Sequence, residues 1–482
     1  MNNKGKKTVE MLLLACISYM ITISIAGLSV FRITQIDILL PCVFGFVWMV
    51  VAYGKKNWEQ ENVPYAGTLA VISSLTIVAG SKFDVYEGIF ADWSIMDAFY
   101  LLFVLLFTLF AGMGIFAFLN KGKVTLFETG QDKKVRRFLP AIFLLLAWLP
   151  YYLTFFPGNM GPDTFESIRM CLGEIPWTNH HPVLFTFLIK LVLEMTSFTG
   201  SLAISMGIFS FLHMLIFALV LSYFLYWMYR RGVKKQWVIL SFLFLAFHPI
   251  VAMYSIYLTK DVLFSCAVLL LVLKIYEIVE TNGQLLQKRG ECVYLAIICL
   301  LTIFLRNNGT YMVAALALCL LAGYRVSWKQ LVTVFGSVFI VTALVKVSVF
   351  GGLGIEKQEF AESASIPLQQ IGYVIANDGE ISNEDRAFLE ELMPISKVKE
   401  VYEPGYTDPY KFDEEFNDAF LNEHKGEFIK VWAHLCKDNF SDYVKAYLMQ
   451  TAGYWHYGET NTVCTQGVAE NSLGVEQIDI IR

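Results

Sequence analysis

Residues 205–229 read SMGIFSFLHMLIFALVLSYFLYWMY and contain no Asp, Glu, Lys or Arg. A helix needs about 20 mainly apolar residues to cross the hydrocarbon core of a bilayer. This run is therefore long enough to span a membrane as one helix, which satisfies its own backbone hydrogen bonds in lipid. The 482-residue chain is 56% hydrophobic and 16% charged, whereas soluble domains are about 25% charged. We expect an integral membrane protein.

Ten further apolar runs accompany this one along the chain. They lie near residues 9–30, 36–53, 64–80, 95–119, 138–156, 237–253, 262–281, 292–305, 310–324 and 331–350. The two-residue alternation that marks the strands of membrane barrels is not seen in them. We therefore predict an all-α fold, a polytopic transmembrane helical bundle of eleven spans. The first run is too long for a signal peptide and has no convincing small-residue cleavage site, which favours a retained anchor.

Basic residues gather in alternate loops between these runs. One set comprises Lys4, Lys6, Lys7, Lys55, Lys56, Lys121, Lys123, Lys133, Lys134, Arg136, Arg137, Arg230, Arg231, Lys234, Lys235, Lys288, Arg289, Arg325 and Lys329. The opposite loops hold the smaller set of Arg32, Lys82, Arg169, Lys190, Lys260 and Arg306. Because short cytoplasmic loops are rich in Lys and Arg, we expect the N-terminus in the cytoplasm and the chain in a plasma membrane.

The apolar run 181–198 would reverse this orientation if it crossed the membrane. It is short for a span, and Lys190 and Glu194 lie one helical turn apart within it, which favours a helix at the membrane interface. Residues 157–204 then form one extracytoplasmic loop, and the chain leaves its last span on the same side. We expect three regions. They are a four-helix membrane region (1–137), a membrane core that includes the loop (138–350) and an extracytoplasmic acidic soluble region (351–482).

The soluble region is strongly acidic. From Gly351 onward the chain has 24 Asp and Glu against 10 Lys and Arg. This charge makes nucleic acid an unlikely partner, since phosphate backbones are bound by basic surfaces. Segments 383–392 and 412–449 carry apolar residues at three- and four-residue spacing, which predicts a mainly helical region.

The long loop and its flanks read FFPGNMGPDTFESIRMCLGEIPWTNHHPVLFTFLIKLVLEM over residues 155–195. The order of a span, an acidic residue, two surface helices and a returning span resembles the GT-C superfamily of membrane glycosyltransferases, in an uncharacterised bacterial branch. In this resemblance the family's acidic residue corresponds to Asp163 and its first surface helix to 164–172. The family's His-Pro or Lys-Pro opening of the second external juxtamembrane helix corresponds to His181 and Pro182. The resemblance implies a GT-C-like core in residues 138–350.

Three shorter motifs are similar to parts of the same superfamily. HPIVAMYSIYLTKDVLFS, residues 248–265, is similar to the next external turn and puts Asp261 where that motif ends in an acid. LRNNGTY (305–311) and SIPLQQIGYVIAN (365–377) look like motifs of the bacterial branch. The resemblance implies an inverting enzyme that moves a hexose or pentose from a polyprenyl-phosphate donor to a glycan, polymer or lipid acceptor of the cell envelope.

Such a transfer needs a general base for the acceptor hydroxyl and cations for the departing phosphate. Asp163 follows the Pro- and Gly-rich segment 157–162, and we predict that it is the base, although its place at a helix start also suits an N-cap. Lys260 and Asp261, in one short turn, and Arg306, in another, are predicted to bind the phosphate. The alternatives are snorkelling by Lys260, helix capping by Asp261 and interfacial anchoring by Arg306.

Two histidines and a second carboxylate complete the predicted site. His180 and His181 would contact the phosphate or the sugar, or bind a metal with Asp163; the alternative is a polar cap at a helix start. Glu166 lies three residues after Asp163, so both carboxylates would share one helical face. That geometry is compatible with a divalent cation, Mg²⁺ or Mn²⁺, held by Asp163 and Glu166.

The competing function is a multi-pass transporter, or a lipid or oligosaccharide flippase without glycosyl transfer. Transporters bind substrate midway through their helices, often between repeated halves. The predicted spans carry few charges midway, and no internal repeat is seen. We therefore favour an enzyme whose partners are the donor lipid, the acceptor and the membrane lipids.

Overall fold

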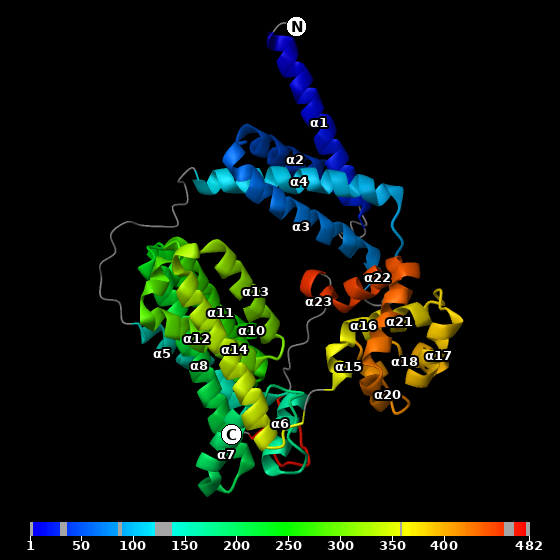
Figure 1. Cartoon of the computed structure of the whole chain (residues 1–482). Helices are drawn as coiled ribbons and strands as arrows, with labels where there is room; N and C mark the ends of the chain where they lie inside the picture. The colour runs from blue at the N-terminus through cyan, green and yellow to red at the C-terminus, as the bar shows by residue number, and fades with distance from the viewer. Residues whose placement is uncertain are drawn as a thin grey trace. The chain divides into compact units, whose positions relative to one another are not determined.

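The computed structural model describes residues 3–28, 36–84, 89–120, 137–356, 359–456 and 467–478. Figure 1 shows a helical protein, whose described strands form two short two-stranded pairs. The predicted all-α fold is confirmed.

The chain divides into two compact units. One consists of Met1–Thr125 and Glu359–Asn461, and the other of Leu126–Gln358 and Thr462–Arg482. The sequence analysis separated the N-terminal membrane region from the soluble region. In the structure these two regions form one unit, because residues far apart in the chain pack together.

Six helical segments within the described residues are long and apolar enough to cross a membrane, or seven if one bent pair counts as a single span. They are Lys6–Gly27, Gln60–Lys82, Ile95–Leu119, Leu202–Arg230, Lys260–Glu280 and Arg325–Phe350. The protein is therefore a multi-pass membrane protein. Each of the eleven predicted runs falls on a helix, but fewer than eleven satisfy the length and composition of a span.

The membrane part of the first unit has four helices, α1 (Asn3–Gly27), α2 (Ile36–Lys56), α3 (Val63–Lys82, after the 3-10 turn η2, Gln60–Asn62) and α4 (Ile95–Asn120). A β-carbon placed on Gly54 of α2 would lie 2.1 Å from the Phe110 carbonyl oxygen of α4. One placed on Gly112 of α4 would lie 3.2 Å from the Ala66 side chain of α3. Small residues thus let these helices approach closely, as is common in lipid.

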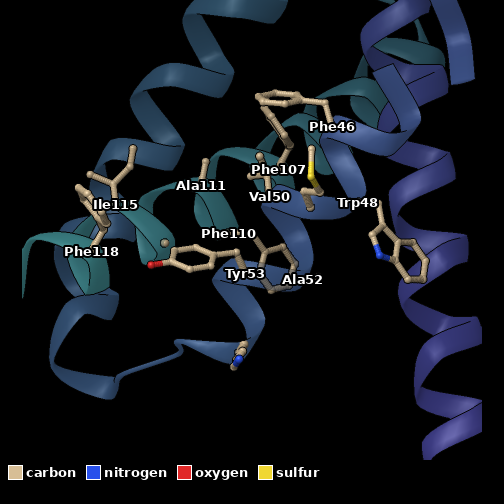
Figure 2. Close-up of a pocket in the computed structure, with 13 residues that line it drawn as sticks. Phe46, Trp48, Val50, Ala52, Tyr53, Phe107, Phe110, Ala111, Ile115 and Phe118 are labelled. Atoms are coloured by element: carbon tan, nitrogen blue, oxygen red, sulfur yellow. The ribbon is translucent and has the colours of Figure 1, made fainter. Parts of the chain in front are cut away.

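An apolar groove of about 850 Å³ lies between α2 and α4. Figure 2 shows aromatic rings along it, including Phe46, Tyr53, Phe107 and Phe110. Lys56 is the charged residue in its lining.

The soluble part of the first unit is a cluster of short helices. They are α15 (Phe360–Ser363), α16 (Ser365–Ala376), α17 (Asn383–Leu392), α18 (Ile395–Val401), α19 (Asp408–Lys411), α20 (Asp418–Glu423), α21 (Lys425–Asp438), α22 (Phe440–Gln450) and α23 (Ala452–Trp455). Its core surrounds Leu368, Ile371, Leu392 and Phe428. The predicted helix 383–392 is confirmed, and the predicted segment 412–449 is divided into α20, α21 and α22.

The second unit holds the remaining membrane helices. They are α5 (Leu139–Thr154), α8 (Leu202–Arg230), α9 (Lys235–Phe247), α10 (Pro249–Ile256), α11 (Lys260–Glu280), α12 (Arg289–Leu305), α13 (Gly309–Gly323) and α14 (Trp328–Leu344). A π-helical turn, η6 (Val345–Phe350), follows α14. Three short 3-10 turns connect other helices, η3 (Ser197–Thr199), η4 (Gln284–Gln287) and η5 (Arg325–Ser327). Helices α9 and α10 meet at a 59° bend. Pro249 explains the bend, because proline lacks the N–H that would continue α9.

Two short helices of the second unit lie between α5 and α8 in the chain. They are α6 (Pro162–Leu172) and α7 (Val183–Met195), which correspond to the predicted surface helices. Phe185, Ile189 and Val192 of α7 are buried in a cluster that includes residues of α6 and α8. The 13-residue helix α7 is not among the segments long and apolar enough to span, as its charged Lys190 and Glu194 predict.

A short parallel strand pair fixes the start of α6 beside the start of α11. Strand β3 (Asn159–Met160) pairs with β4 (Tyr257–Leu258). The Thr164 hydroxyl of α6 donates a hydrogen bond to the Leu258 carbonyl. Because α6 and α11 each begin within a few residues of these strands, the pairing brings their first turns together.

The close approach of α2 and α4 gives a stability prediction. We expect Gly54→Ala to lower the thermal unfolding midpoint of the purified protein, because the new methyl group would overlap the Phe110 carbonyl oxygen. Overpacking of this kind costs about 1–3 kcal/mol. Gly45→Ala in the same helix is the matched control, because a β-carbon there meets nothing within 4 Å. Equal midpoints for the two variants would contradict the packing described.

Candidate functional site at the start of helices α6 and α11

The two predicted capping carboxylates lie inside their helices, so neither is the N-cap. Gly161 is the N-cap of α6, and Asp163 lies in the first turn. Thr259 is the N-cap of α11, and its hydroxyl accepts a hydrogen bond from the Asp261 backbone N–H at 3.3 Å. The alternative roles of Asp163 and Asp261 as N-caps are therefore wrong, and both carboxylates face other side chains.

Lys260 joins α11 to α6 through an ion pair. Its Nζ lies 2.5 Å from Oδ2 of Asp163, a residue 97 positions earlier in the chain. The Lys260 side chain is 12% exposed, whereas that of Asp163 is 51% exposed. Lys260 therefore turns toward the carboxylate, which leaves Asp163 accessible on its outer side.

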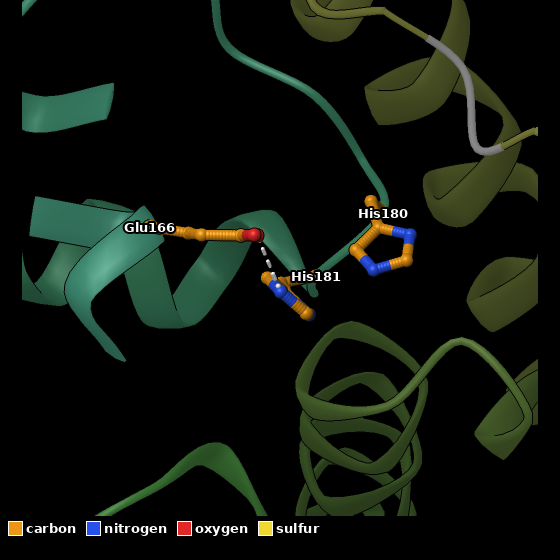
Figure 3. A group of neighbouring side chains, drawn as sticks. All are labelled: Glu166, His180 and His181. Carbon is orange, nitrogen blue, oxygen red and sulfur yellow. Dashed lines mark hydrogen bonds and ion pairs between the residues drawn. The ribbon is translucent and has the colours of Figure 1, made fainter. Parts of the chain in front are cut away.

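His181 lies between this ion pair and Glu166. Lys260 Nζ lies 3.0 Å from His181 Nδ1, and His181 Nε2 lies 2.8 Å from Glu166 Oε2. A lysine ammonium only donates hydrogen bonds, so Nδ1 is the acceptor and Nε2 carries the proton. Figure 3 shows the Nε2 contact with Glu166. The network thus fixes His181 as the neutral imidazole with its proton on Nε2.

The same contacts shift two pKa values. Burial alone would raise the pKa of Asp163, but the hydrogen bond and charge of Lys260, with smaller contributions from His181 and His180, hold it below its ordinary value. Burial and the nearby Lys260 charge lower the pKa of His181, although Asp163 and Glu166 act in the opposite direction. Asp163 is therefore ionised and His181 neutral near pH 7.

A second ion pair lies next to the first. Arg306 Nη1, in the turn between α12 and α13, is 2.6 Å from Asp261 Oδ1, and both side chains are more than 40% exposed. The Arg306 guanidinium also lies 5.8 Å from the ring centroid of Phe264. The Arg306 side chain therefore contacts Asp261 and Phe264 and remains partly exposed to solvent.

The α12–α13 turn is tied to the loop that carries the histidines. Asn307 Nδ2 donates to the backbone oxygen of Asn179 at 3.0 Å. The Asn179 N–H in turn donates to the Glu356 carbonyl at 2.8 Å. Sequence reasoning did not select Asn179 or Asn307, although Asn307 stands in the quoted LRNNGTY motif beside Arg306.

The site combines an ionised, half-exposed carboxylate with two cations, a largely buried Lys260 and a partly exposed Arg306. Lysine has three N–H donors and arginine five. Two donors of Lys260 are directed to Asp163 and His181, and the described ion pair of Arg306 uses one of its donors. Both cations therefore have donors left for an anionic ligand. Seven predicted site residues are brought into one region from three separate segments of the chain.

The residues that could hold a metal ion differ from the predicted pair. Glu166, His180 and His181 each offer a ligand atom within 4.8 Å of the others, whereas Asp163 is directed to Lys260. Mg²⁺ prefers oxygen ligands, and two imidazoles with one carboxylate suit Zn²⁺ or Mn²⁺ better. Binding at His181 Nε2 would require loss of the proton that this nitrogen donates to Glu166. The donor types fit a transition metal, while the hydrogen-bonded arrangement is complete without one.

His213 and His456 lie outside this site. His213 is buried in α8, and its Nδ1 lies 3.1 Å from the Ser255 carbonyl oxygen, which is typical of a core histidine. Trp455 and His456 pack on Phe83 in the first unit.

Comparison with known proteins identifies a family without an assigned activity. The profile of a Family of unknown function (DUF6020) matches residues 175–472, more than half of the chain. The match includes the site residues His180, His181, Lys260, Asp261 and Arg306. No curated protein and no solved structure gives a significant match.

The network around His181 predicts a charge-dependent titration. We expect the imidazole of His181 to titrate below its ordinary pKa of 6.5. Lys260→Met should raise that midpoint, because it removes a positive charge that disfavours the imidazolium and leaves Asp163 to favour it. The measurement is a pH titration of ¹³C-labelled histidines by NMR in nanodiscs, with the His181 signal assigned from His181→Gln.

Lys190→Met is the matched control for this titration. Lys190 lies on α7 and pairs with Glu194 at 3.5 Å. We expect the His181 midpoint to stay unchanged in this variant. An unchanged or lower midpoint in Lys260→Met would contradict the assigned hydrogen bonds.

Proposed function

The chain belongs to the Family of unknown function (DUF6020), and we propose that it is a membrane glycosyltransferase of the GT-C type. It would move a sugar from a polyprenyl-phosphate donor to a cell-envelope acceptor, with inversion, at the extracytoplasmic face of a plasma membrane. The observation that carries the proposal is the contact between Lys260 and the exposed Asp163. It places a candidate base and a candidate phosphate ligand side by side.

The reaction assigns one task to each charged group. The acceptor oxygen attacks the anomeric carbon, and the bond from that carbon to the phosphate oxygen breaks, so the phosphate leaves with the electron pair. The hydroxyl proton passes to the Asp163 carboxylate. Lys260 and Arg306 stabilise the negative charge on the phosphate, because preorganised cations act most strongly where charge develops.

The ion pair also explains how a weakly basic carboxylate would become effective. Lys260 is the main group that lowers the pKa of Asp163. When Lys260 turns toward a bound phosphate, this influence weakens and Asp163 becomes a stronger base. General bases positioned in this way contribute about 10²–10⁴ in rate.

Two observations support the proposed side of the membrane. The basic residues favour a cytoplasmic N-terminus. Eleven predicted crossings put the α3–α4 connection, the loop 157–204 and residues 351–482 on one side. Within the first unit, Lys445 of α22 lies 2.6 Å from Asp92 of the α3–α4 connection, as two segments on the same side would allow.

A divalent cation is included in the proposal only as an accessory. Glu166, His180 and His181 would hold it, and their ligand types favour Zn²⁺ or Mn²⁺ over Mg²⁺. It would supply additional positive charge near the phosphate. The tasks assigned to Asp163, Lys260 and Arg306 do not depend on it.

Transport of a lipid-linked sugar is the competing proposal. A transporter would use buried charged residues within its spans. Lys274 of α11 is one such residue, and its Nζ lies 2.6 Å from a carboxylate oxygen of Glu277 and from one of Glu291. These groups lie toward the end of α11 opposite to Lys260, at the start of α12. Substrate sites of transporters lie near the bilayer midplane. A charge cluster toward the end of a span does not match that position, so we prefer the enzyme proposal.

Removal of the proposed base gives the first functional prediction. Purified protein in liposomes would be assayed for release of polyprenyl phosphate from a panel of polyprenyl-phosphate hexoses and pentoses, with an envelope-glycan extract as acceptor. We expect Asp163→Asn to reduce the rate by about 100-fold or more, because the amide cannot accept the proton. Normal turnover by this variant would remove Asp163 as the base.

Glu174→Gln is the matched control for Asp163→Asn. Glu174 is a half-exposed carboxylate just after α6, and its contact with Arg169 is long, at 4.0 Å. We expect it to retain the wild-type rate. Movement of the sugar lipid across the bilayer without release of polyprenyl phosphate by wild-type protein would instead support transport.

Arg306 gives a prediction on donor binding. We expect Arg306→Gln to raise the KM for the polyprenyl-phosphate donor more than it lowers kcat, because a phosphate-binding cation contributes to ground-state binding. Loss of one hydrogen bond to a charged group costs about 1.5–3 kcal/mol, which is roughly 10-fold or more in affinity. An unchanged KM would leave Arg306 as an interfacial anchor.

A further inference from the structure

Helix α22 has an exposed apolar face in a region that is strongly acidic overall. Phe440, Val444 and Tyr447 lie at i, i+4 and i+7, so they share one side of the helix. Their exposed fractions are 67%, 37% and 46%. Tyr454 of α23 follows, at 90% exposed. Water is an unfavourable neighbour for a row of large apolar side chains.

The opposite face of α22 shares a buried cluster with the end of α3 and with the connection that follows α3. Ala446 and Met449 are buried in one cluster with Ala79 of α3 and Phe90 of β2 (Ile89–Phe90). β2 pairs with β1 (Phe83–Asp84), which directly follows α3. Figure 1 shows α22 beside this end of α3. The helix is thus held where a membrane span ends.

Further contacts hold α22 and α23 beside the end of α3 and the start of α4. His456 Nε2 lies 3.2 Å from the carbonyl oxygen of Gly80, in the last turn of α3. Trp455 lies 6.4 Å from Phe83, measured between ring centroids. Lys445 pairs with Asp92 at 2.6 Å, just before α4 begins. α22 and α23 therefore lie beside the end of α3 and the start of α4, both of which belong to candidate membrane spans.

We propose that the face formed by Phe440, Val444 and Tyr447 is inserted in the interfacial layer of the bilayer, with phospholipid as its occupant. Phe and Tyr beside a span end are typical of the aromatic belt at a membrane interface. Amphipathic helices in that layer bury their apolar face at the boundary of headgroups and acyl chains.

Residues that follow Asp92 in the chain are also apolar and exposed. Trp93 and Met96, at the start of α4, are 47% and 52% exposed, and Ile95 between them is 91% exposed. The exposed face of α22 is thus apolar like the start of α4, which belongs to a candidate span and must itself meet lipid. The ion pair of Lys445 with Asp92 offsets the charges next to it. The soluble region is anchored to the membrane surface by α22 as well as by its covalent link, a role separate from the proposed glycosyl transfer.

Site-specific photocrosslinking tests this inference in the full-length protein. A benzophenone amino acid replaces Phe440 or Tyr447, and the protein is reconstituted in vesicles of phosphatidylcholine and phosphatidylglycerol. Because both side chains are exposed, their replacement leaves the core of the region intact, which circular dichroism would check. On illumination we expect peptides containing position 440 or 447 to gain the mass of one phospholipid.

Position 412 is the matched control. Phe412 follows α19 and is 59% exposed, and neither it nor α19 contributes a residue to the described cluster of Ala446 and Met449 with Ala79 of α3. We expect no phospholipid adduct there. Equal adducts at 412, no adduct at 440 and 447, or crosslinks to protein in place of lipid would overturn the inference. The readout needs no sugar transfer, so it stands apart from the test of the proposed enzyme.

Discussion

Hydrocarbon cannot accept or donate hydrogen bonds, and this constraint shapes the whole protein. Backbone groups within the membrane must be satisfied inside helices, and charged side chains are costly away from the interface. Polar chemistry is therefore confined to places where helices begin and end. The candidate site lies where several helices begin or end. Asp163 and Lys260 each lie in the first turn of a helix, and Arg306 lies in the turn between two others.

The site depends on a small non-helical element. Two residues of β3 pair with two of β4, and the Thr164 hydroxyl adds a hydrogen bond to the Leu258 carbonyl. These contacts hold the first turn of α6 against the first turn of α11. The distance between Lys260 and Asp163 follows from that arrangement, and His181 completes it by accepting from Lys260 and donating to Glu166. The resulting network is one in which a bound anion would compete with Asp163 for a single ammonium group.

Much of the fold could be predicted because its determinants are local. An apolar run of the right length forms a helix in lipid whatever its neighbours are, so each predicted run is helical in the structure. The bend at Pro249 was not predicted, since residues 237–253 form one predicted run, although its cause, a proline, is local. The number of helices long enough to span was less predictable, since short helices such as α5 and α13 depend on their packing partners.

The sequence by itself determined that the protein is helical and crosses a membrane several times, and it selected the charged residues of the candidate site. The helices and crossings could be predicted because hydropathy and charge act residue by residue, whereas the site residues were selected through the resemblance to the GT-C superfamily. Tertiary structure alone decided that Lys260 pairs with Asp163, that His181 is neutral with its proton on Nε2, and that α22 packs on α3. These features join positions about a hundred or several hundred residues apart. Spacing along the chain does not encode which helix ends meet, because that depends on how all the intervening helices pack.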